Sequence, residues 1–206
     1  MKQLLYLCTA FCLLMAASCQ DQTQPYRSGD LIFVEGSPSG AMDQAIMHST
    51  GTMVHVGIVE VRGDSVFVID ATPKTGVSRR DLATFFEQQK DENGHLPNMK
   101  LMRLRAPYDV EAFVAKAKSH CGKPYDLSFL PDNDRYYCSE LIYDCYQVEG
   151  KPLFEAEPMN FRNSQGEFDP YWVELFEAQG MAIPQDALGT NPEAMSHATC
   201  LKEIVF

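Results

Sequence analysis

The feature that most constrains the fold is a pair of adjacent apolar segments joined by a short turn. Residues 53–61 (MVHVGIVEV) form a nearly continuous apolar run, and residues 65–71 (SVFVIDA) form a second one. Runs of this length, rich in valine and isoleucine, are typical of strands buried in a sheet. Gly63 and Asp64 lie between them, and such a pair indicates a hairpin turn. The sequence therefore predicts antiparallel strands over residues 53–71.

These two strands carry two polar residues, His55 and Asp70, among their apolar ones. If Arg62 faces Ser65 across a two-residue turn, paired residue numbers sum to 127 and Gly57 faces Asp70. His55 and Asp70 are then diagonal neighbours on one face of the sheet, roughly 7–8 Å apart at the backbone. Gly57 has no side chain, so the imidazole and the carboxylate have room to meet. A three-residue loop would place them on opposite faces.

Cys138 comes directly before a predicted helix, whose apolar residues recur as Leu141, Ile142, Cys145 and Val148. Free backbone N–H groups and the positive end of the helix dipole favour a thiolate at such a position. The alternative interpretation is a small cysteine of the core. Likewise, a histidine on a strand is more often a hydrogen-bonded core residue than a base. A buried aspartate, however, needs a partner, and His55 is the nearest candidate for Asp70.

Together these residues have the composition of a site for nucleophilic acyl transfer. Such a site needs a nucleophile, a base and a group that orients the base. We therefore predict Cys138 as nucleophile, His55 as base and Asp70 as the orienting residue.

Five motifs occur along the chain in a fixed order. They are residues 29–33 (GDLIF), 55–59 (HVGIV), 68–71 (VIDA), 122–126 (GKPYD) and 137–141 (YCSEL). In this order they resemble the YiiX/YebB-like branch of the NlpC-type cysteine hydrolases, which have a papain-like fold. The resemblance runs from about residue 27 to about residue 148.

The resemblance implies an α+β, circularly permuted papain-like (NlpC-type) fold, in which an antiparallel sheet packs against the helix that bears the nucleophile. It assigns the same three catalytic residues, Cys138, His55 and Asp70. The family pattern has glutamate at the position of Asp70, so this chain is one methylene shorter there. Tyr125 lies in the loop that leads to Cys138, and we expect it to line the substrate cleft. The implied chemistry requires no cofactor and no metal.

The N-terminal residues have the features of an export signal. Lys2 is followed by an apolar stretch over residues 4–17, which is short for a membrane span. It ends in Ala16-Ala17-Ser18-Cys19, which resembles a lipoprotein cleavage box. We expect residues 1–18 to be a signal peptide and Cys19 to be lipidated; an ordinary signal-peptidase cut is the alternative. Residues 19–26 are predicted to be a tether, and residues 27–206 a single hydrolase domain. The predicted location is the bacterial cell envelope, on its periplasmic or surface side.

The chain is acidic, with 17 Lys and Arg against 28 Asp and Glu and a formal net charge of −11. Such a charge argues against binding to nucleic acid or to anionic membrane surfaces. We expect membrane contact only through the lipid anchor, a monomer, and a small peptide, N-acyl amino acid or lipid-like substrate.

Three of the seven cysteines lie outside the predicted signal peptide and have no predicted role: Cys121, Cys145 and Cys200. Three thiols cannot all pair with one another. Cys145 belongs to the apolar face of the Cys138 helix and is predicted to be a core thiol, whereas a Cys121–Cys200 disulfide is conceivable. The chain contains no C-x-x-C or H-x-x-x-H spacing, so local motifs predict no zinc site.

The rest of the chain is interpreted as scaffold. Periodicity predicts helices over residues 79–89, 109–120 and 170–180, a strand over residues 100–105, and a long ordered loop over residues 151–170. Asp109 is the predicted N-cap of the second helix. The other histidines, His48, His95, His120 and His197, are interpreted as surface or structural residues.

Three functions remain open at this stage. The first is an amidase or peptidase that forms an acyl-enzyme on cell-wall peptides or N-acyl amino acids. The second is a lipid acyltransferase, lipase or thioesterase with the same three residues. The third is a non-catalytic binding module. A cleft with polar groups and a charged anchor favours the first, a long apolar tunnel favours the second, and a Cys138 out of reach of His55 favours the third.

Overall fold

A computed structural model describes residues 25–205 of the chain. The predicted signal peptide and Cys19, the predicted site of lipidation, lie outside these residues. Within the described part, none of the helices has the length and apolar character needed to cross a membrane.

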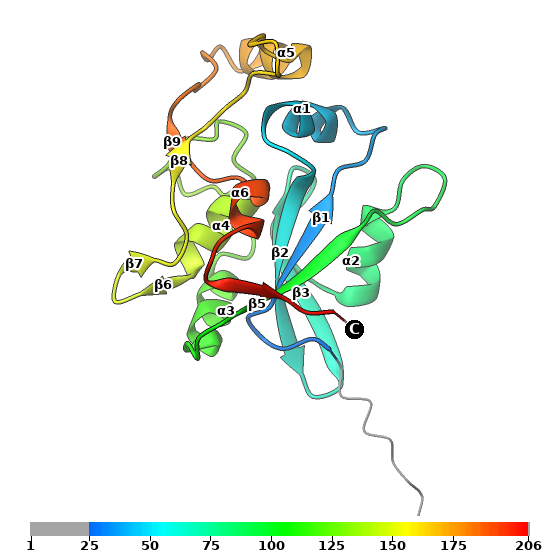
Figure 1. Cartoon of the computed structure of the whole chain (residues 1–206), viewed down its shortest axis with the longest axis vertical. Coiled ribbons are helices and arrows are strands. Elements are labelled where there is room, and N and C mark those ends of the chain that lie inside the picture. Colours follow the sequence, from blue (N-terminus) through cyan, green and yellow to red (C-terminus); the bar gives the residue numbers. More distant parts are fainter. Residues whose placement is uncertain (1–24, 206) are drawn as a thin grey trace, which may run out of the picture.

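The described chain forms one six-stranded sheet with helices on both faces, and two short two-stranded pairs (Figure 1). The strands are β1 (Leu31–Glu35), β2 (Met53–Arg62), β3 (Ser65–Thr72), β4 (Gly76–Asp81), β5 (Met99–Leu104), β6 (Gln147–Val148), β7 (Lys151–Pro152), β8 (Glu157–Pro158), β9 (Leu188–Gly189) and β10 (Leu201–Glu203). The helices are α1 (Ala41–Ser49), α2 (Leu82–Gln89), α3 (Val110–Ser119), α4 (Cys138–Cys145), α5 (Pro170–Ala178) and α6 (Pro192–Ser196).

The large sheet has the order β10-β5-β1-β2-β3-β4, and its neighbouring strands are antiparallel. The predicted hairpin is confirmed: Arg62 pairs with Ser65 and Ile58 with Ile69, so paired numbers sum to 127. An apolar run forms β2 at the centre of the sheet because both of its faces are covered. The α+β class with an antiparallel sheet is therefore confirmed.

Two apolar clusters fill the two faces of the sheet. On one face, α3, α4 and α6 pack against β2 and its neighbours around residues such as Phe33, Ile58 and Leu141. On the other face, α2 contributes Phe85, which packs against Val59 and Val68. Figure 1 shows α2 on the opposite side of the sheet from α3, α4 and α6. Helix α4 is thereby held directly against β2 and β3.

A third apolar cluster lies away from the sheet, where α1 and α5 meet at one end of the molecule (Figure 1). It contains Phe129, Phe161, Trp172 and Phe176, all at most 6% exposed. Trp172 is thus a core residue. The predicted loop over residues 151–170 contains the short strands β7 and β8, and the helix after it is α5.

A buried carboxylate ties the hairpin to its neighbours. Glu60 is fully buried on β2 and accepts hydrogen bonds from Arg62 (2.7 Å), Arg79 (2.5 Å) and Lys118 (3.0 Å). Burial raises the pKa of Glu60, but the three basic partners outweigh it and lower the value to about 2. A buried charge with partners of this kind avoids the cost of an unpaired one. Glu60 therefore links β2 to β4 and to α3.

One predicted boundary is wrong. The helix predicted over residues 79–89 starts only at Leu82, because residues 79–81 continue β4. Asp81 ends the strand and caps the helix, since its side chain accepts a hydrogen bond from Thr84 N (2.8 Å). The prediction for α3 is confirmed, with Asp109 as N-cap to Ala112 N (3.2 Å).

Candidate active site

The hairpin places His55 and Asp70 side by side. His55 Nε2 and Asp70 Oδ2 are 2.8 Å apart, and the aspartate is fully buried while the histidine side chain is 14% exposed. Gly57 makes room for this pair: a Cβ atom there would lie 2.6 Å from Val68 Cγ1 and 3.3 Å from Asp70 Cβ. The backbone register expected for a two-residue turn is what brings the two side chains to the same face.

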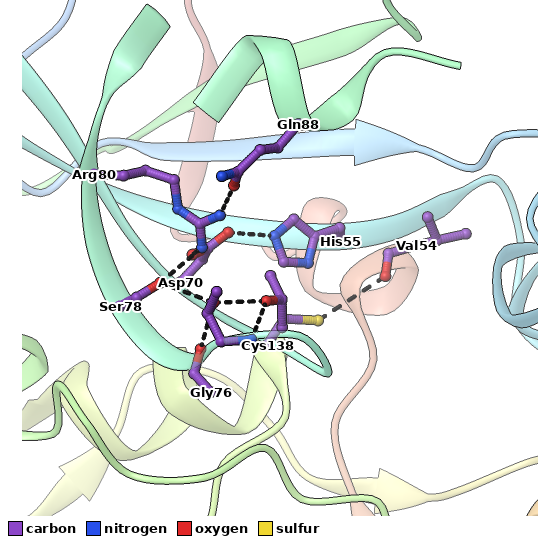
Figure 2. A network of polar contacts seen from close by, with 10 residues as sticks. Val54, His55, Asp70, Gly76, Ser78, Arg80, Gln88 and Cys138 are labelled. Atoms are coloured by element: carbon purple, nitrogen blue, oxygen red, sulfur yellow. Dashed lines mark hydrogen bonds and ion pairs between the residues drawn. The ribbon is translucent and has the colours of Figure 1, made fainter. Parts of the chain in front are cut away.

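The second oxygen of Asp70 has a partner that the sequence did not reveal. Arg80, on β4, donates from its Nη2 to Asp70 Oδ1 and also to Ser78 Oγ (2.8 Å). Gln88, on α2, accepts from Arg80 Nη1, as Figure 2 shows. Arg80 was predicted to start a helix, and only the pairing of β3 with β4 places it beside Asp70. A guanidinium that donates to a buried carboxylate keeps the negative charge of the carboxylate paired.

Helix α4 brings Cys138 to the same place. Cys138 is its first residue, is 5% exposed, and directs Sγ toward the carbonyl oxygen of Val54 (3.9 Å). The helix start is fixed by Glu140, whose Oε2 accepts from Tyr137 N (3.3 Å). Figure 2 shows His55 lying between Asp70 and Cys138. The structure thus brings the three predicted residues together from β2, β3 and the N-terminus of α4.

The protonation of His55 follows from its two neighbours. Burial lowers the pKa of His55, but hydrogen bonds to Asp70 and Cys138 and their negative charges outweigh burial and raise the value to about 10. At neutral pH the ring is therefore an imidazolium, which can pair with a thiolate on one side and a carboxylate on the other. This is the charge state that cysteine nucleophiles use.

A polar groove of about 460 Å³ opens over these residues. His55, Cys138 and Tyr125 line it, and its charged groups are Glu35, Asp43, Lys74, Arg80 and Glu87. The three acids have partners, since Glu35 accepts from Asn98 (2.8 Å), Asp43 from Ser37 N (2.9 Å) and Glu87 from Lys90 (2.5 Å). Lys74 is exposed and forms no ion pair or hydrogen bond among residues 25–205. The groove therefore offers one cation that is free to meet a ligand.

A second, smaller space adjoins Cys138. This crevice of about 40 Å³ is lined mainly by apolar side chains, among them Ile46, Phe129 and Trp172. Tyr125 and Cys138 line both the groove and the crevice. Burial, and then the charge of Cys138, raise the pKa of Tyr125 well above its usual value, so its hydroxyl stays a donor. Tyr125 thus lies beside Cys138, and its contact with a substrate stays a prediction.

The other thiols lie elsewhere. Cys121 is exposed, Cys145 buried and Cys200 partly buried, and each of them is free, so no Cys121–Cys200 disulfide forms. Burial raises the pKa of Cys145. Cys145 is a core thiol, as predicted. Of the four described thiols, Cys138 alone lines the groove.

The fold and this site define a cysteine hydrolase of papain-like architecture. The chain belongs to the family of permuted papain-like amidases, YaeF/YiiX, the C92 family, whose model matches residues 25–205. It is 27% identical over 187 residues to the protein YiiX of Escherichia coli (strain K12), covering 86% of this chain and 85% of that protein. A crystal structure described as metalloprotein yiiX from Escherichia coli O157:H7 has a TM-score of 0.72 and 25% identity, covering 88% of this chain and 98% of that chain. The protein is therefore an enzyme of the cysteine hydrolase class.

Proposed function

We propose that this hydrolase cleaves an amide bond in a small peptide or N-acyl amino acid, through an acyl-enzyme on Cys138. The observation that carries the proposal is that the His55–Asp70 pair and Cys138 lie together at one polar groove, which His55 and Cys138 both line. Nucleophile, base and orienting carboxylate then have the geometry that acyl transfer needs. A binding module would not need this arrangement.

In the proposed mechanism the thiolate of Cys138 attacks the carbonyl carbon, and the carbonyl oxygen becomes an oxyanion. The backbone N–H of Cys138, at the N-terminus of α4, is placed to donate to that oxyanion, and such a donor typically contributes about 10²–10³ in rate. The imidazolium of His55 gives its proton to the leaving amine. Neutral His55 then takes a proton from water as water attacks the thioester, which releases the acid and restores the thiolate.

The charges of the groove support a substrate with a carboxylate. Lys74 is the groove cation without a partner in the described chain, whereas Arg80 is held by Asp70, Ser78 and Gln88. A carboxylate of an amino acid or peptide bound at Lys74 would extend along the groove toward Cys138. Tyr125 would donate its hydroxyl to a polar group of the substrate next to the bond that is cleaved.

The second candidate, a lipid acyltransferase, lipase or thioesterase, draws on the apolar crevice beside Cys138. Its volume of about 40 Å³ is less than a tenth of the groove's 460 Å³, so it accommodates a short apolar group rather than a long acyl chain. This difference favours the amidase.

The test is an activity screen on the wild type beside Cys138→Ala. Peptide amides and N-acyl amino acids form one set of substrates, and long-chain esters and thioesters the other. We expect hydrolysis of the first set, lost in Cys138→Ala. With Lys74→Met, KM should rise for substrates with a free carboxylate and stay unchanged for their amidated forms. Lys202→Met, an exposed lysine on β10, is the matched control. Preferential hydrolysis of the second set would contradict the proposal.

We also propose that the enzyme is a lipoprotein of the cell envelope, anchored through Cys19. The support is the sequence before residue 25, with its apolar stretch and cleavage box. Each buried CH₂ of an attached acyl chain contributes about 0.8 kcal/mol to membrane binding, so two or more chains should resist a high-salt wash. Membrane fractionation of the wild type and of Cys19→Ser checks this. Native protein found wholly in the soluble fraction would contradict it.

A further inference from the structure

The buried carboxylate of the candidate site has a cationic partner on the side away from the histidine. Asp70 is fully buried, and its Oδ2 lies 2.8 Å from His55 Nε2. Its Oδ1 accepts a hydrogen bond from Arg80 Nη2, and the Arg80 side chain is 9% exposed. Figure 2 shows Asp70 between Arg80 and His55. The two strands that flank β3 therefore supply one partner for each oxygen of the carboxylate.

Arg80 is held in place by further acceptors. Its Nη2 also donates to Ser78 Oγ (2.8 Å) on β4, and its Nη1 donates to Gln88 Oε1 on α2. Both terminal nitrogens of the guanidinium thus have acceptors, and a planar guanidinium bound in this way has a fixed orientation. The network extends from the hairpin to α2, on the face of the sheet opposite to α4.

The third nitrogen of the guanidinium argues against a purely structural role. Arg80 Nε is buried and has no hydrogen-bond partner in the described chain. A buried donor without a partner costs free energy, and a buried ion pair is often no more stabilising than apolar side chains of similar volume. The stability of the fold therefore does not explain why an arginine stands here, whereas an effect on Asp70 does.

The charges of the site are balanced only when Arg80 is included. In the proposed resting state Cys138 is a thiolate, His55 an imidazolium, Asp70 a carboxylate and Arg80 a guanidinium. Neighbouring charges then alternate in sign and sum to zero. Without Arg80 the three remaining groups would leave a net negative charge at a buried position, which is costly.

We propose that Arg80 is a positioning residue of the reaction, which fixes the carboxylate of Asp70 so that its other oxygen stays directed at His55. The inference rests on the proposed function, because it assumes that His55 and Asp70 serve Cys138. The last side-chain torsion of an aspartate has broad minima, so a carboxylate bound at one oxygen turns easily. A donor at the second oxygen restricts that rotation. Among residues 25–205 no hydrogen bond joins Arg80 to His55 or Cys138, so Arg80 would act through Asp70.

A double-mutant cycle in the full-length protein tests this role on a peptide amide from the screen. Arg80→Met should lower kcat by about 10–100-fold and leave KM within about twofold, because other residues of the groove bind the substrate. Arg80→Lys keeps the charge and should recover part of kcat. In the Asp70→Asn background, Arg80→Met should change kcat by less than about threefold, because the group through which it acts is already altered.

Alkylation of Cys138 by iodoacetamide at pH 7 repeats the cycle without a substrate. The rate should fall in Arg80→Met and in Asp70→Asn, and it should fall no further in the double variant. This measurement separates the two proposals. If the proposed substrate class is wrong, the alkylation rates still show whether Arg80 acts through Asp70.

Arg103→Met is the matched control, because Arg103 forms a similar ion pair with the buried Asp30 (Nε–Oδ1 2.7 Å) and does not line the groove. It should lower stability but leave kcat and the alkylation rate unchanged in folded protein, which circular dichroism verifies. Should Arg80→Met fail to fold, Gln88→Ala at an exposed position removes one acceptor of Arg80 and should lower kcat about two- to tenfold.

Three results would overturn the proposal. The first is an unchanged kcat in folded Arg80→Met. The second is a loss in the double variant that equals the product of the two single losses, since Arg80 would then act independently of Asp70. The third is a raised KM with an unchanged kcat, since Arg80 would then bind the substrate itself.

Discussion

Helix α4 has a cysteine at each end, and each cysteine lies beside a histidine–aspartate pair with an Nε2–Oδ2 distance of 2.8 Å. At the N-terminal end are Cys138, His55 and Asp70. At the C-terminal end are Cys145, His120 and Asp144. The three residue types are the same, so their identity alone does not decide what a cluster does.

The two clusters differ in helix polarity and in the second ring nitrogen. The N-terminus of α4 favours an anion, and there Cys138 lines the groove together with His55. The C-terminus favours a cation, and there Nδ1 of His120 has no partner. The first arrangement suits an activated thiolate, whereas the second has no group that meets the free nitrogen of its histidine. The comparison teaches that a Cys–His–Asp cluster can stabilise negative charge at the N-terminus of a helix and positive charge at the C-terminus.

The largest expected effect concerns the two aspartates. Asp70→Asn should lower turnover by a factor on the order of 10²–10⁴, because the amide no longer fixes the charged ring of His55. Asp70→Glu should retain most of the activity, because it keeps the charge and matches the family pattern. Steady-state kinetics on a substrate from the screen measures both.

Asp144→Asn is the matched control for Asp70→Asn, since it removes the same charge from the other pair. It should change turnover by less than about tenfold, because Asp144 does not contact His55 or Cys138. Equal losses in the two variants would show that Asp70 acts on the fold rather than on His55.

A smaller effect concerns the reactivity of the two thiols. Since His55 has its pKa raised to about 10, the imidazolium persists across neutral pH. Alkylation of Cys138 by iodoacetamide at pH 7 should thus be faster in the wild type than in His55→Ala, because the imidazolium favours the attacking thiolate. In His55→Ala the rate should rise about tenfold per pH unit up to the ordinary thiol pKa of about 8.5. Cys145 should react only after unfolding, because it is 2% exposed. Mass spectrometry of the alkylated peptides gives each rate.

The raised pKa of His55 also makes the stability of the fold depend on pH. A histidine whose pKa is higher in the folded than in the unfolded chain stabilises the fold fully below about pH 6.5, and this contribution is lost as the pH rises through about 10. A wild-type alkylation profile that follows the ordinary thiol curve would contradict the ion pair.

The smallest expected effect concerns Glu140, which caps the N-terminal end of α4. Burial, and then the charge of Asp126, raise the pKa of Glu140 to about 8. A carboxyl whose pKa is raised on folding destabilises the fold as the pH rises from about 4.5 to about 8. Glu140→Gln keeps an acceptor for Tyr137 N and removes this pH-dependent loss of stability. We expect a gain of about 1–3 kcal/mol in unfolding free energy at pH 8 and none at pH 4.

Urea denaturation of wild type and Glu140→Gln at the two pH values measures this difference. Glu193→Gln, an acid outside α4 whose carboxylate accepts from Met53 N (2.8 Å), likewise keeps an acceptor and is a control expected to show no gain in stability at pH 8. A Glu140→Gln variant that is no more stable at pH 8 than at pH 4 would rule out the buried proton.

The sequence was sufficient for the parts of the site that depend on local pattern. A two-residue turn and strand alternation placed His55 and Asp70 on one face, and the register confirmed this. The helical period after Cys138 gave α4. These are short-range rules, and each acts within one hairpin or one helix.

What the sequence could not predict depends on contacts between distant segments. Arg80 contacts Asp70 only because β4 pairs with β3. The sequence around Arg80 resembles the start of a helix. Strand β10 has three residues, too few for a period, and forms because β5 offers an open edge. Helix α1 had a weak signal, since Met42, Ala45 and Ile46 follow helical spacing.

The position of the single tryptophan allows one part of this enzyme to be followed by fluorescence. Trp172 donates to Ser49 Oγ (3.3 Å) within the apolar cluster of α1 and α5, and it lines the crevice beside Cys138. Intrinsic tryptophan fluorescence therefore reports on this cluster, whereas far-ultraviolet circular dichroism averages over the whole chain. A fluorescence transition that precedes the dichroism transition would reveal that the crevice wall opens while the sheet and its His55–Asp70 pair are still folded.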